Sequence, residues 1–156
     1  MIIRKFVQED ACAVGELFFQ TVHTINAKDY APELLSMWAP NNDEFTNLVR
    51  NCHDNIFYVV EHESILVGFG DMRHDGHLER LFVHKDFQGK KIGTMLLNKI
   101  EQEAHGLGLS RITTEASIRA QPFFLKHGFE VIKRLYKKHE HKGLDFITYK
   151  MVKYLK

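Results

Sequence analysis

One glycine-bearing turn of the chain combines the residue types that hold a phosphate group. Gly89 and Gly93 flank Lys90 and Lys91, after an apolar run and before an amphipathic stretch. The first turn of a helix presents backbone N–H groups without intrahelical partners, and the helix dipole is positive there. Glycine lets such a backbone approach a ligand closely, and lysine adds charge. We therefore predict an anion cradle over residues 88–94; the alternative is an ordinary turn with its lysines in water.

A histidine and a glutamate lie on the run that leads into this turn. His77, Glu79 and Leu81 alternate, so their side chains share one face of a strand if no bulge intervenes. Imidazole and carboxylate are side chains that serve as general bases, so either residue could accept a proton in catalysis. The alternative for both is a polar side chain in water at a strand end.

Hydrophobic periodicity predicts the elements that position these groups. Alternating or β-rich runs favour strands, and apolar residues three to four apart favour helices. The predicted strands are 2–7, 56–61, 66–72, 78–83, 111–116, 129–137 and 146–152, the last two joined through Gly143; the predicted helices are 10–26, 30–38, 45–51, 92–106 and 121–127. The strand–helix–strand order over 78–116 is typical of a parallel βαβ unit in a mixed α/β sheet. We expect one domain over residues 1–156.

The composition excludes several classes of protein. Lys and Arg total 21 against 20 Asp and Glu, a net charge of +1, which is too balanced for a dedicated nucleic-acid binder. Cys12 and Cys52 form no C-x-x-C pattern, and no apolar run reaches the roughly 18 residues of a membrane span. His139 and His141 alternate but identify no third metal ligand. We expect a cytoplasmic protein with no metal, nucleic-acid or membrane partner.

Two motifs give the chain a resemblance to a known family. Residues 88–93, Gln-Gly-Lys-Lys-Ile-Gly, resemble motif A of the GNAT (GCN5-related) N-acetyltransferases, (Q/R)-x-x-G-x-(G/A). Residues 116–129, from Ala116 to Phe129, resemble motif B, N-x-x-A-x-x-F-Y-x-x-x-G-F, in the family's order and spacing. The resemblance covers most of the chain and is closest to bacterial small-molecule enzymes. It implies the GNAT acyl-CoA N-acyltransferase fold, a mixed, mostly antiparallel sheet with a splayed parallel pair, 78–83 and 111–116, flanked by helices.

The same resemblance implies a site for acetyl-CoA as co-substrate. The pantetheine arm would lie in the splayed gap, the pyrophosphate on motif A, and a backbone amide near Phe82 would stabilise the oxyanion. The implied cofactor-binding residues are Leu81, Phe82, Val83, Gln88, Gly89, Lys90, Lys91, Ile92, Gly93, Thr94, Ser117, Ala120, Phe123 and Phe124. The implied reaction is transfer of the acetyl group to a primary amine, expected to be a small molecule, in a ternary complex with Glu79 or His77 as base. A homodimer is an assembly that the resemblance allows.

Three positions depart from the family's pattern. Lys91 stands where motif A has its middle glycine, Ser117 stands where motif B has Asn, and Phe124 replaces the Tyr that protonates the departing thiolate. Ser117 and Tyr136 are the substitutes for that acid that we can name, although a thiolate with a pKa of about 8.5 already leaves tolerably. The departures keep two alternatives open, a peptide or protein N-acetyltransferase and a noncatalytic acyl-CoA-binding domain. Aromatic candidates for the acceptor pocket, each of which also suits the core, are Tyr30, Trp38, Phe57, Tyr136 and Phe146.

Overall fold

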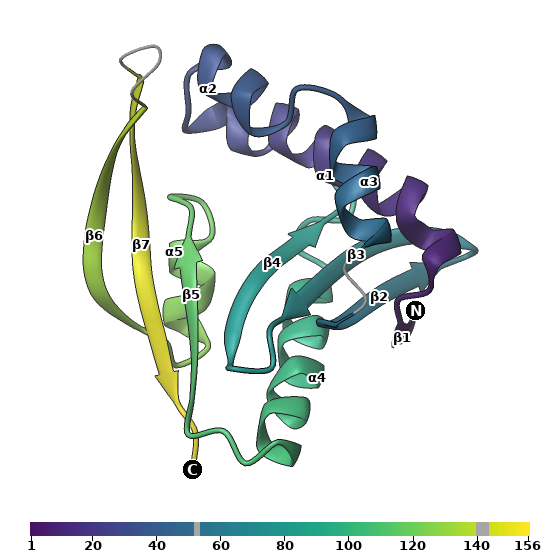
Figure 1. Cartoon of the computed structure of the whole chain (residues 1–156), viewed down its shortest axis with the longest axis vertical. Coiled ribbons are helices and arrows are strands. Elements are labelled where there is room, and N and C mark those ends of the chain that lie inside the picture. The colour runs from purple at the N-terminus through teal and green to yellow at the C-terminus, as the bar shows by residue number, and fades with distance from the viewer. Residues whose placement is uncertain (52–53, 140–143) are drawn as a thin grey trace.

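A computed structural model describes residues 1–51, 54–139 and 144–156. A seven-stranded sheet has the order β1-β2-β3-β4-β5-β7-β6. All neighbouring strands are antiparallel except β4 and β5, which run parallel. Figure 1 shows the β1–β4 half and the β5–β7 half diverging from the end at which β4 and β5 are paired. The strands are β1 (Ile2–Lys5), β2 (Ile56–His62), β3 (Ile65–Met72), β4 (His77–Val83), β5 (Arg111–Ala116), β6 (Glu130–His139) and β7 (Leu144–Tyr154).

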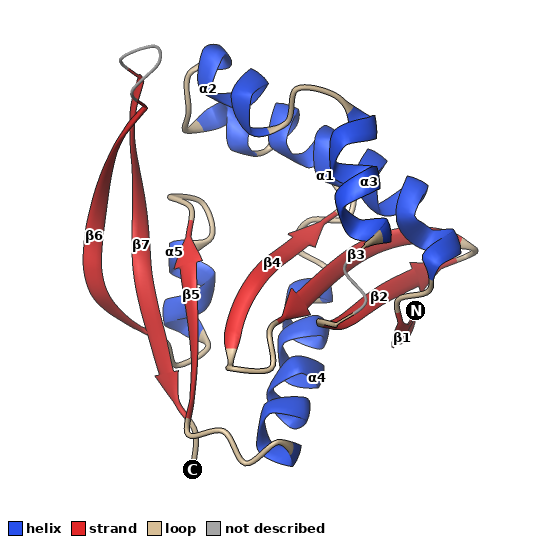
Figure 2. Cartoon of the chain, viewed as in Figure 1, coloured by secondary structure: helices blue, strands red, loops and turns tan. Residues whose placement is uncertain are grey.

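Helices cover both faces of the sheet. Alternation along β2 decides which face each helix covers: Phe57 and Val59 pack in the cluster that holds the first three helices, whereas Tyr58 and Val60 pack with the fourth. Figure 2 shows the first three helices on one side of β2–β4 and α4 on the other. The helices are α1 (Ala11–Thr24), α2 (Pro32–Trp38), α3 (Asn42–Arg50), α4 (Ile92–Gly106) and α5 (Gln121–Lys126), with short 3-10 turns at Gln8–Asp10 and Asn26–Lys28.

Local sequence explains where these helices begin and which face they bury. The stripe predicted for α4, formed by Ile92, Leu96, Ile100 and Ala104, is almost wholly buried. The third helix begins at residue 42, three residues before the predicted start, because the side chain of Asn41 accepts the backbone N–H of Glu44 at 2.9 Å and caps it. The first strand ends at residue 5, two residues before the predicted end. The mixed α/β fold with a parallel strand pair is confirmed.

A bulge in β4 breaks the regular pairing of β3 with β4. Asp71 lies opposite Arg80, and Met72 lies opposite Leu78, so Glu79 has no opposing residue on β3. One additional residue on one strand bends that strand and increases its twist. The ion pair at 2.5 Å between Arg80 and the fully buried Asp71 fixes the register on one side of the bulge. The strand therefore changes direction at Glu79.

The bulge overturns the expected alternation of His77, Glu79 and Leu81 on one face. Leu78 and Leu81 both pack with the cluster that includes residues of α4, although they are three positions apart. Phe82 packs on the other face, against the cluster that holds α1. A regular strand would place Leu78 and Leu81 on opposite faces, because successive side chains alternate. The side chains at 77, 79 and 81 therefore do not form one continuous row.

Within the described ranges, no helix is both long enough and apolar enough to span a bilayer. Gly143, predicted to join the last two strands, lies outside the described residues.

Candidate active site

The parallel strands β4 and β5 separate soon after they meet. Their pairing consists of His77 opposite Thr113 and Leu78 opposite Thr114. The Thr114 hydroxyl donates to the Leu78 carbonyl at 3.0 Å, which closes this end of the gap. Beyond it, residues 80–83 pair with β3 alone among the strands that the structure describes. The bulge at Glu79 coincides with the point of separation, so a segment of β4 main chain is left facing a gap.

The register shows which main-chain groups face that gap. The His84 N–H donates to the Val67 carbonyl at 2.9 Å. Hydrogen-bonded and non-bonded pairs alternate along an antiparallel ladder, so Phe82, two residues earlier, is again bonded to β3. The N–H groups of Leu81 and Val83 consequently point away from β3, into the gap. This geometry excludes the Phe82 amide as the predicted oxyanion donor and leaves the amides of Leu81 and Val83 as candidates.

The gap ends at a turn whose side chains are engaged within the protein. The Gln88 amide donates from Nε2 to the Val83 carbonyl at 2.7 Å. The Thr21 hydroxyl of α1 donates to the same carbonyl at 3.2 Å. The Lys90 ammonium lies 5.6 Å from the centre of the Phe87 ring, a cation–π distance. Gln88 therefore fixes the end of β4, and the backbone of the turn and the exposed Lys91 side chain are left to meet a ligand.

The N-terminus of α4 supplies that backbone. The first intrahelical bond runs from the Met95 N–H to the Lys91 carbonyl at 3.0 Å, so the N–H groups of Ile92, Gly93 and Thr94 precede it. Lys91 has φ of +63°, in the left-handed region that glycine adopts without strain. The conformation of the usual glycine is thus retained although the residue is lysine. Gly89 also has a positive φ of +75°.

Gly93 lies in a tight contact within the protein. A Cβ atom at this position would lie 3.2 Å from Cζ of Phe123, closer than ordinary packing allows. The missing side chain lets the first turn of α4 approach α5. The approach of the Gly93 backbone to a ligand stays a prediction.

The segment that leads into α5 joins the gap to the core. Ser117 Oγ accepts the Ala120 N–H at 3.2 Å and so forms the turn before the helix. Phe124 is only 4% exposed and packs between the rings of Phe123 and Phe129, with ring centres 5.2 and 5.0 Å away. The ring that stands where a Tyr is usual is therefore part of the core.

The two base candidates have different partners. His77 Nδ1 lies 2.9 Å from Thr113 Oγ1, so this imidazole is turned toward β5. The Glu79 carboxylate lies 3.4 Å from the Arg73 guanidinium, which comes from the β3–β4 turn, and about a third of its side chain is exposed. Glu79 is the first residue of β4 beyond the paired end of the gap. Neither role is tested by this geometry, and both stay predictions.

A third carboxylate, missed in the sequence, faces the same region. Glu115 follows Thr113 at the alternate position of β5 and contacts Lys137 of β6 and the Thr148 hydroxyl of β7, the latter at 2.7 Å. Burial by itself would raise the pKa of Glu115, but hydrogen bonds from Lys137 and Thr148 outweigh it, and the net direction is downward. Side chains alternate along β5 and Ile112 is buried, so alternation alone could have placed Glu115 on the opposite, less buried face of the strand.

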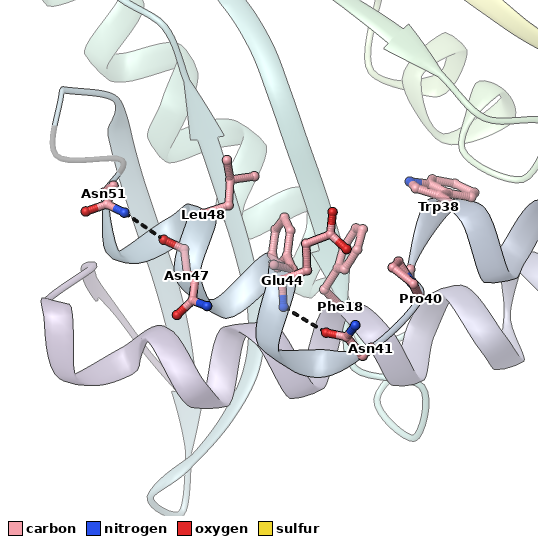
Figure 3. Close-up of a pocket in the computed structure, with 10 residues that line it drawn as sticks. Phe18, Trp38, Pro40, Asn41, Glu44, Asn47, Leu48 and Asn51 are labelled. Atoms are coloured by element: carbon pink, nitrogen blue, oxygen red, sulfur yellow. Dashed lines mark hydrogen bonds between the residues drawn. The ribbon is translucent and has the colours of Figure 1, made fainter.

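Two hollows adjoin the helices above β4. The first encloses about 430 Å³, and its residues include Phe18, Trp38 and Glu44, whose side chains Figure 3 shows around the same space. The second encloses about 240 Å³ and is lined by Tyr30, Tyr136 and their neighbours from α2 and β7. Tyr30 and Trp38 pack edge to face between the hollows, with ring centres 5.9 Å apart.

The aromatic residues predicted for the acceptor pocket are divided between the two hollows and the core. Trp38 lines the first hollow, while Tyr30, Tyr136 and Phe146 line the second. Phe57 is buried and stacked on Phe6. Tyr136 is therefore placed with the second hollow and not with the turn at residues 88–94. Its role as an acid stays a prediction.

The described side chains form no cluster of metal ligands. Within 1–51, 54–139 and 144–156, no three or more His, Cys, Asp or Glu side chains are grouped to hold an ion. His141 and the side chain of His139, the alternating pair of the sequence, lie outside the described residues.

The chain is similar in sequence and in fold to known proteins. The acetyltransferase (GNAT) domain family matches residues 26–153. An uncharacterized N-acetyltransferase of Methanocaldococcus jannaschii is 30% identical over 148 residues, with 90% of this chain and 85% of that protein covered. A GCN5-related N-acetyltransferase crystal structure from Rhodopseudomonas palustris has a TM-score of 0.89 at 26% identity, covering 99% of this chain and 95% of that one. The PaiA N-acetyltransferase of Thermoplasma acidophilum, crystallised with coenzyme A, has a TM-score of 0.75 at 25% identity, covering 99% and 98%.

Proposed function

The chain belongs to the GNAT acetyltransferase family, and from this premise we propose that it transfers the acetyl group of acetyl-CoA to the primary amine of a small molecule. One observation carries the proposal: β4 leaves its parallel neighbour at Glu79, and the opening ends at the free N–H groups of α4. An extended ligand arm with an anionic end fits such a gap, because the strand offers unpaired amides and the helix offers a positive dipole.

In this proposal, the pantetheine arm of acetyl-CoA pairs with the main chain of Leu81 and Val83. The Val83 carbonyl already accepts two hydrogen bonds, so its N–H is the group that remains available. The pyrophosphate lies on the turn, where the amides of Ile92, Gly93 and Thr94 and the charge of Lys91 meet it. The similar PaiA protein was crystallised in complex with coenzyme A, which supports a CoA ligand for this fold.

The chemical step needs a place for one proton and for one negative charge. The amine nitrogen forms a bond to the thioester carbonyl carbon, and the carbon–sulfur bond breaks to release the CoA thiolate. The Leu81 N–H is the preorganised donor for charge that develops on the carbonyl oxygen. Glu79 accepts the proton that the amine loses, directly or through water, and solvent returns a proton to the thiolate. His77 is the alternative base, held by Thr113.

The acceptor is placed in the first hollow. Phe18, one of its walls, packs edge-on against Phe82 of β4 at 5.1 Å between ring centres, so this hollow adjoins the strand that borders the gap. Its volume of about 430 Å³ lies within the range of small-molecule sites, about 300–1,000 Å³. Cytoplasmic residence, supported by cysteine usage, and a homodimer are further parts of the proposal.

Thiol release from acetyl-CoA, measured with a panel of small primary amines, tests this function. We expect amine-dependent release that falls about 10²-fold or more in Glu79→Gln at neutral pH and much less at high pH, where free amine is plentiful. Glu63→Gln, on the β2–β3 turn, is the matched control and should leave release unchanged. Mass shifts confined to a peptide library would favour the peptide alternative. Binding of acetyl-CoA without release to any acceptor would favour a noncatalytic domain.

A further inference from the structure

A histidine joins the two helices that border the cradle. His127 directly follows α5, and its Nδ1 lies 2.9 Å from the carbonyl oxygen of Phe123. Its Nε2 lies 3.0 Å from Oγ1 of Thr94, in the first turn of α4. The imidazole also lies on the Phe123 ring, with centres 4.4 Å apart. Both ring nitrogens are thus engaged, and one of them touches a residue of the cradle.

These two partners determine where the protons lie. A backbone carbonyl can only accept a hydrogen bond, so Nδ1 carries the hydrogen and donates to Phe123. In a neutral imidazole the other nitrogen is then an acceptor. Nε2 therefore accepts the hydroxyl hydrogen of Thr94, and neutral His127 directs that hydrogen toward α5.

With its hydrogen directed toward α5, the Thr94 hydroxyl cannot donate to an anion at the N-terminus of α4. Side chains in a helix lean toward its N-terminus, so Thr94 Oγ1 lies on the side where the pyrophosphate is proposed to sit. With its hydrogen on His127, the hydroxyl presents lone pairs to that side. When imidazole is protonated, both nitrogens donate, and the Thr94 hydrogen becomes free to turn toward phosphate oxygen.

We propose that binding of the CoA pyrophosphate takes up a proton at His127, which then donates to Thr94 while Thr94 donates to the phosphate. This inference rests on the proposed function, because it requires the pyrophosphate to lie on residues 88–94. His127 is a positioning residue, since it reaches the ligand only through Thr94. Imidazole is the side chain suited to this role, because its charge changes between about pH 5 and 8.

The charged side chains nearest to His127 come from α4, α5 and β7. On α4, Lys91 precedes Thr94 by less than one turn. From β7, the Lys153 side chain lies against Gly128 and is ion-paired with Glu101 of α4 at 2.8 Å. Lys126 comes from α5 itself. The pyrophosphate brings negative charge to Thr94, so the ligand itself supplies the charge that stabilises protonated His127.

Calorimetric titration with dephospho-CoA in buffers of different ionisation enthalpy measures the proton uptake. This probe keeps the pyrophosphate but lacks the phosphomonoester, which would itself titrate near pH 6. At about pH 7.5, where an ordinary imidazole is mostly neutral, we expect uptake approaching one proton per ligand. The Kd should rise with pH, by at most about tenfold per pH unit.

Variants then locate the proton. His127→Gln and Thr94→Val should each abolish the uptake, and Thr94→Ser should retain it. His105→Gln, at the other end of α4, and His84→Gln, at the entrance to the turn, are matched controls that should retain it. Tight binding of the probe with no proton uptake, or uptake that survives His127→Gln, would overturn the inference and leave the proposed function standing. Failure of the wild-type chain to bind either dephospho-CoA or acetyl-CoA would instead refute the proposed function.

Discussion

Replacing Lys91 with glycine should stabilise the free protein and lower its affinity for CoA. Lys91 has φ of +63° and an exposed side chain, so its backbone is strained and its removal leaves no cavity. The left-handed conformation costs an L-residue about 1–2 kcal/mol. Glycine avoids that cost but loses about 0.5–1 kcal/mol more backbone entropy on folding.

The difference predicts a gain of roughly 0.5–1 kcal/mol in the free energy of unfolding of Lys91→Gly. In a chain of this size, such a gain raises Tm by about 1–4 °C. The lost charge acts in the opposite direction on the complex. Exposed charge pairs contribute about 0.2–1 kcal/mol, so the Kd for CoA should rise no more than about 5-fold.

Thermal unfolding of the free protein measures the change in stability, and titration with CoA measures the change in Kd. Lys91→Ala distinguishes the effect of backbone strain from that of the lost charge. Alanine removes the same charge but keeps the left-handed strain, so its Kd should match that of Lys91→Gly without the gain in stability. Lys90→Gly, at a neighbouring position without positive φ, should lower Tm. Equal stability of the glycine and alanine variants at position 91 would refute the argument from strain.

Three further changes test other parts of the structure. Gly93→Val places side-chain carbon against the Phe123 ring and should cost about 1–3 kcal/mol of stability and abolish the thermal shift given by acetyl-CoA; a folded variant with an unchanged shift would remove the turn from consideration. Phe124→Tyr adds a hydroxyl to the core and should cost about 1–3 kcal/mol with little change in acyl-transfer rate; a large gain in rate would show that thiolate protonation limits the reaction. Burial, followed by the hydrogen bond to Glu103 and its charge, raises the pKa of Tyr58 to about 12. Because the unfolded pKa is about 10, the folded state holds this proton more tightly, and stability should fall as pH rises from about 10 to 12; urea unfolding of Tyr58→Phe across that range should show a smaller fall, and an equal fall would contradict the assignment.

Periodicity and motif spacing predicted most of the fold. The stripe of α4 became a buried face because a repeat of three to four residues is a local property of the chain. The unusual conformation of Lys91 was also foreseeable, since it stands where the family has glycine. Such inferences succeed when a residue's neighbours in sequence decide its environment.

The bulge and the contacts of two site residues could not be predicted in this way. The position of Glu79 outside the ladder depends on Asp71 pairing with Arg80, a contact between strands that alternation does not reveal. Glu115 depends on Lys137 and Thr148 from two other strands. The proposed role of His127 depends on its contact with Thr94, which lies 33 positions earlier in the chain. Each depends on long-range packing.

Amide hydrogen exchange, resolved residue by residue, tests the proposed acetyl-CoA site in the gap most directly. In the free protein, the Phe82 amide should exchange slowly because it is bonded to β3, whereas those of Leu81 and Val83, which face the gap, should exchange faster. Acetyl-CoA should slow exchange at Leu81 and Val83 and leave Phe82 unchanged. Saturating acetyl-CoA that leaves Leu81 and Val83 as exchangeable as before would contradict the placement of the co-substrate between β4 and β5.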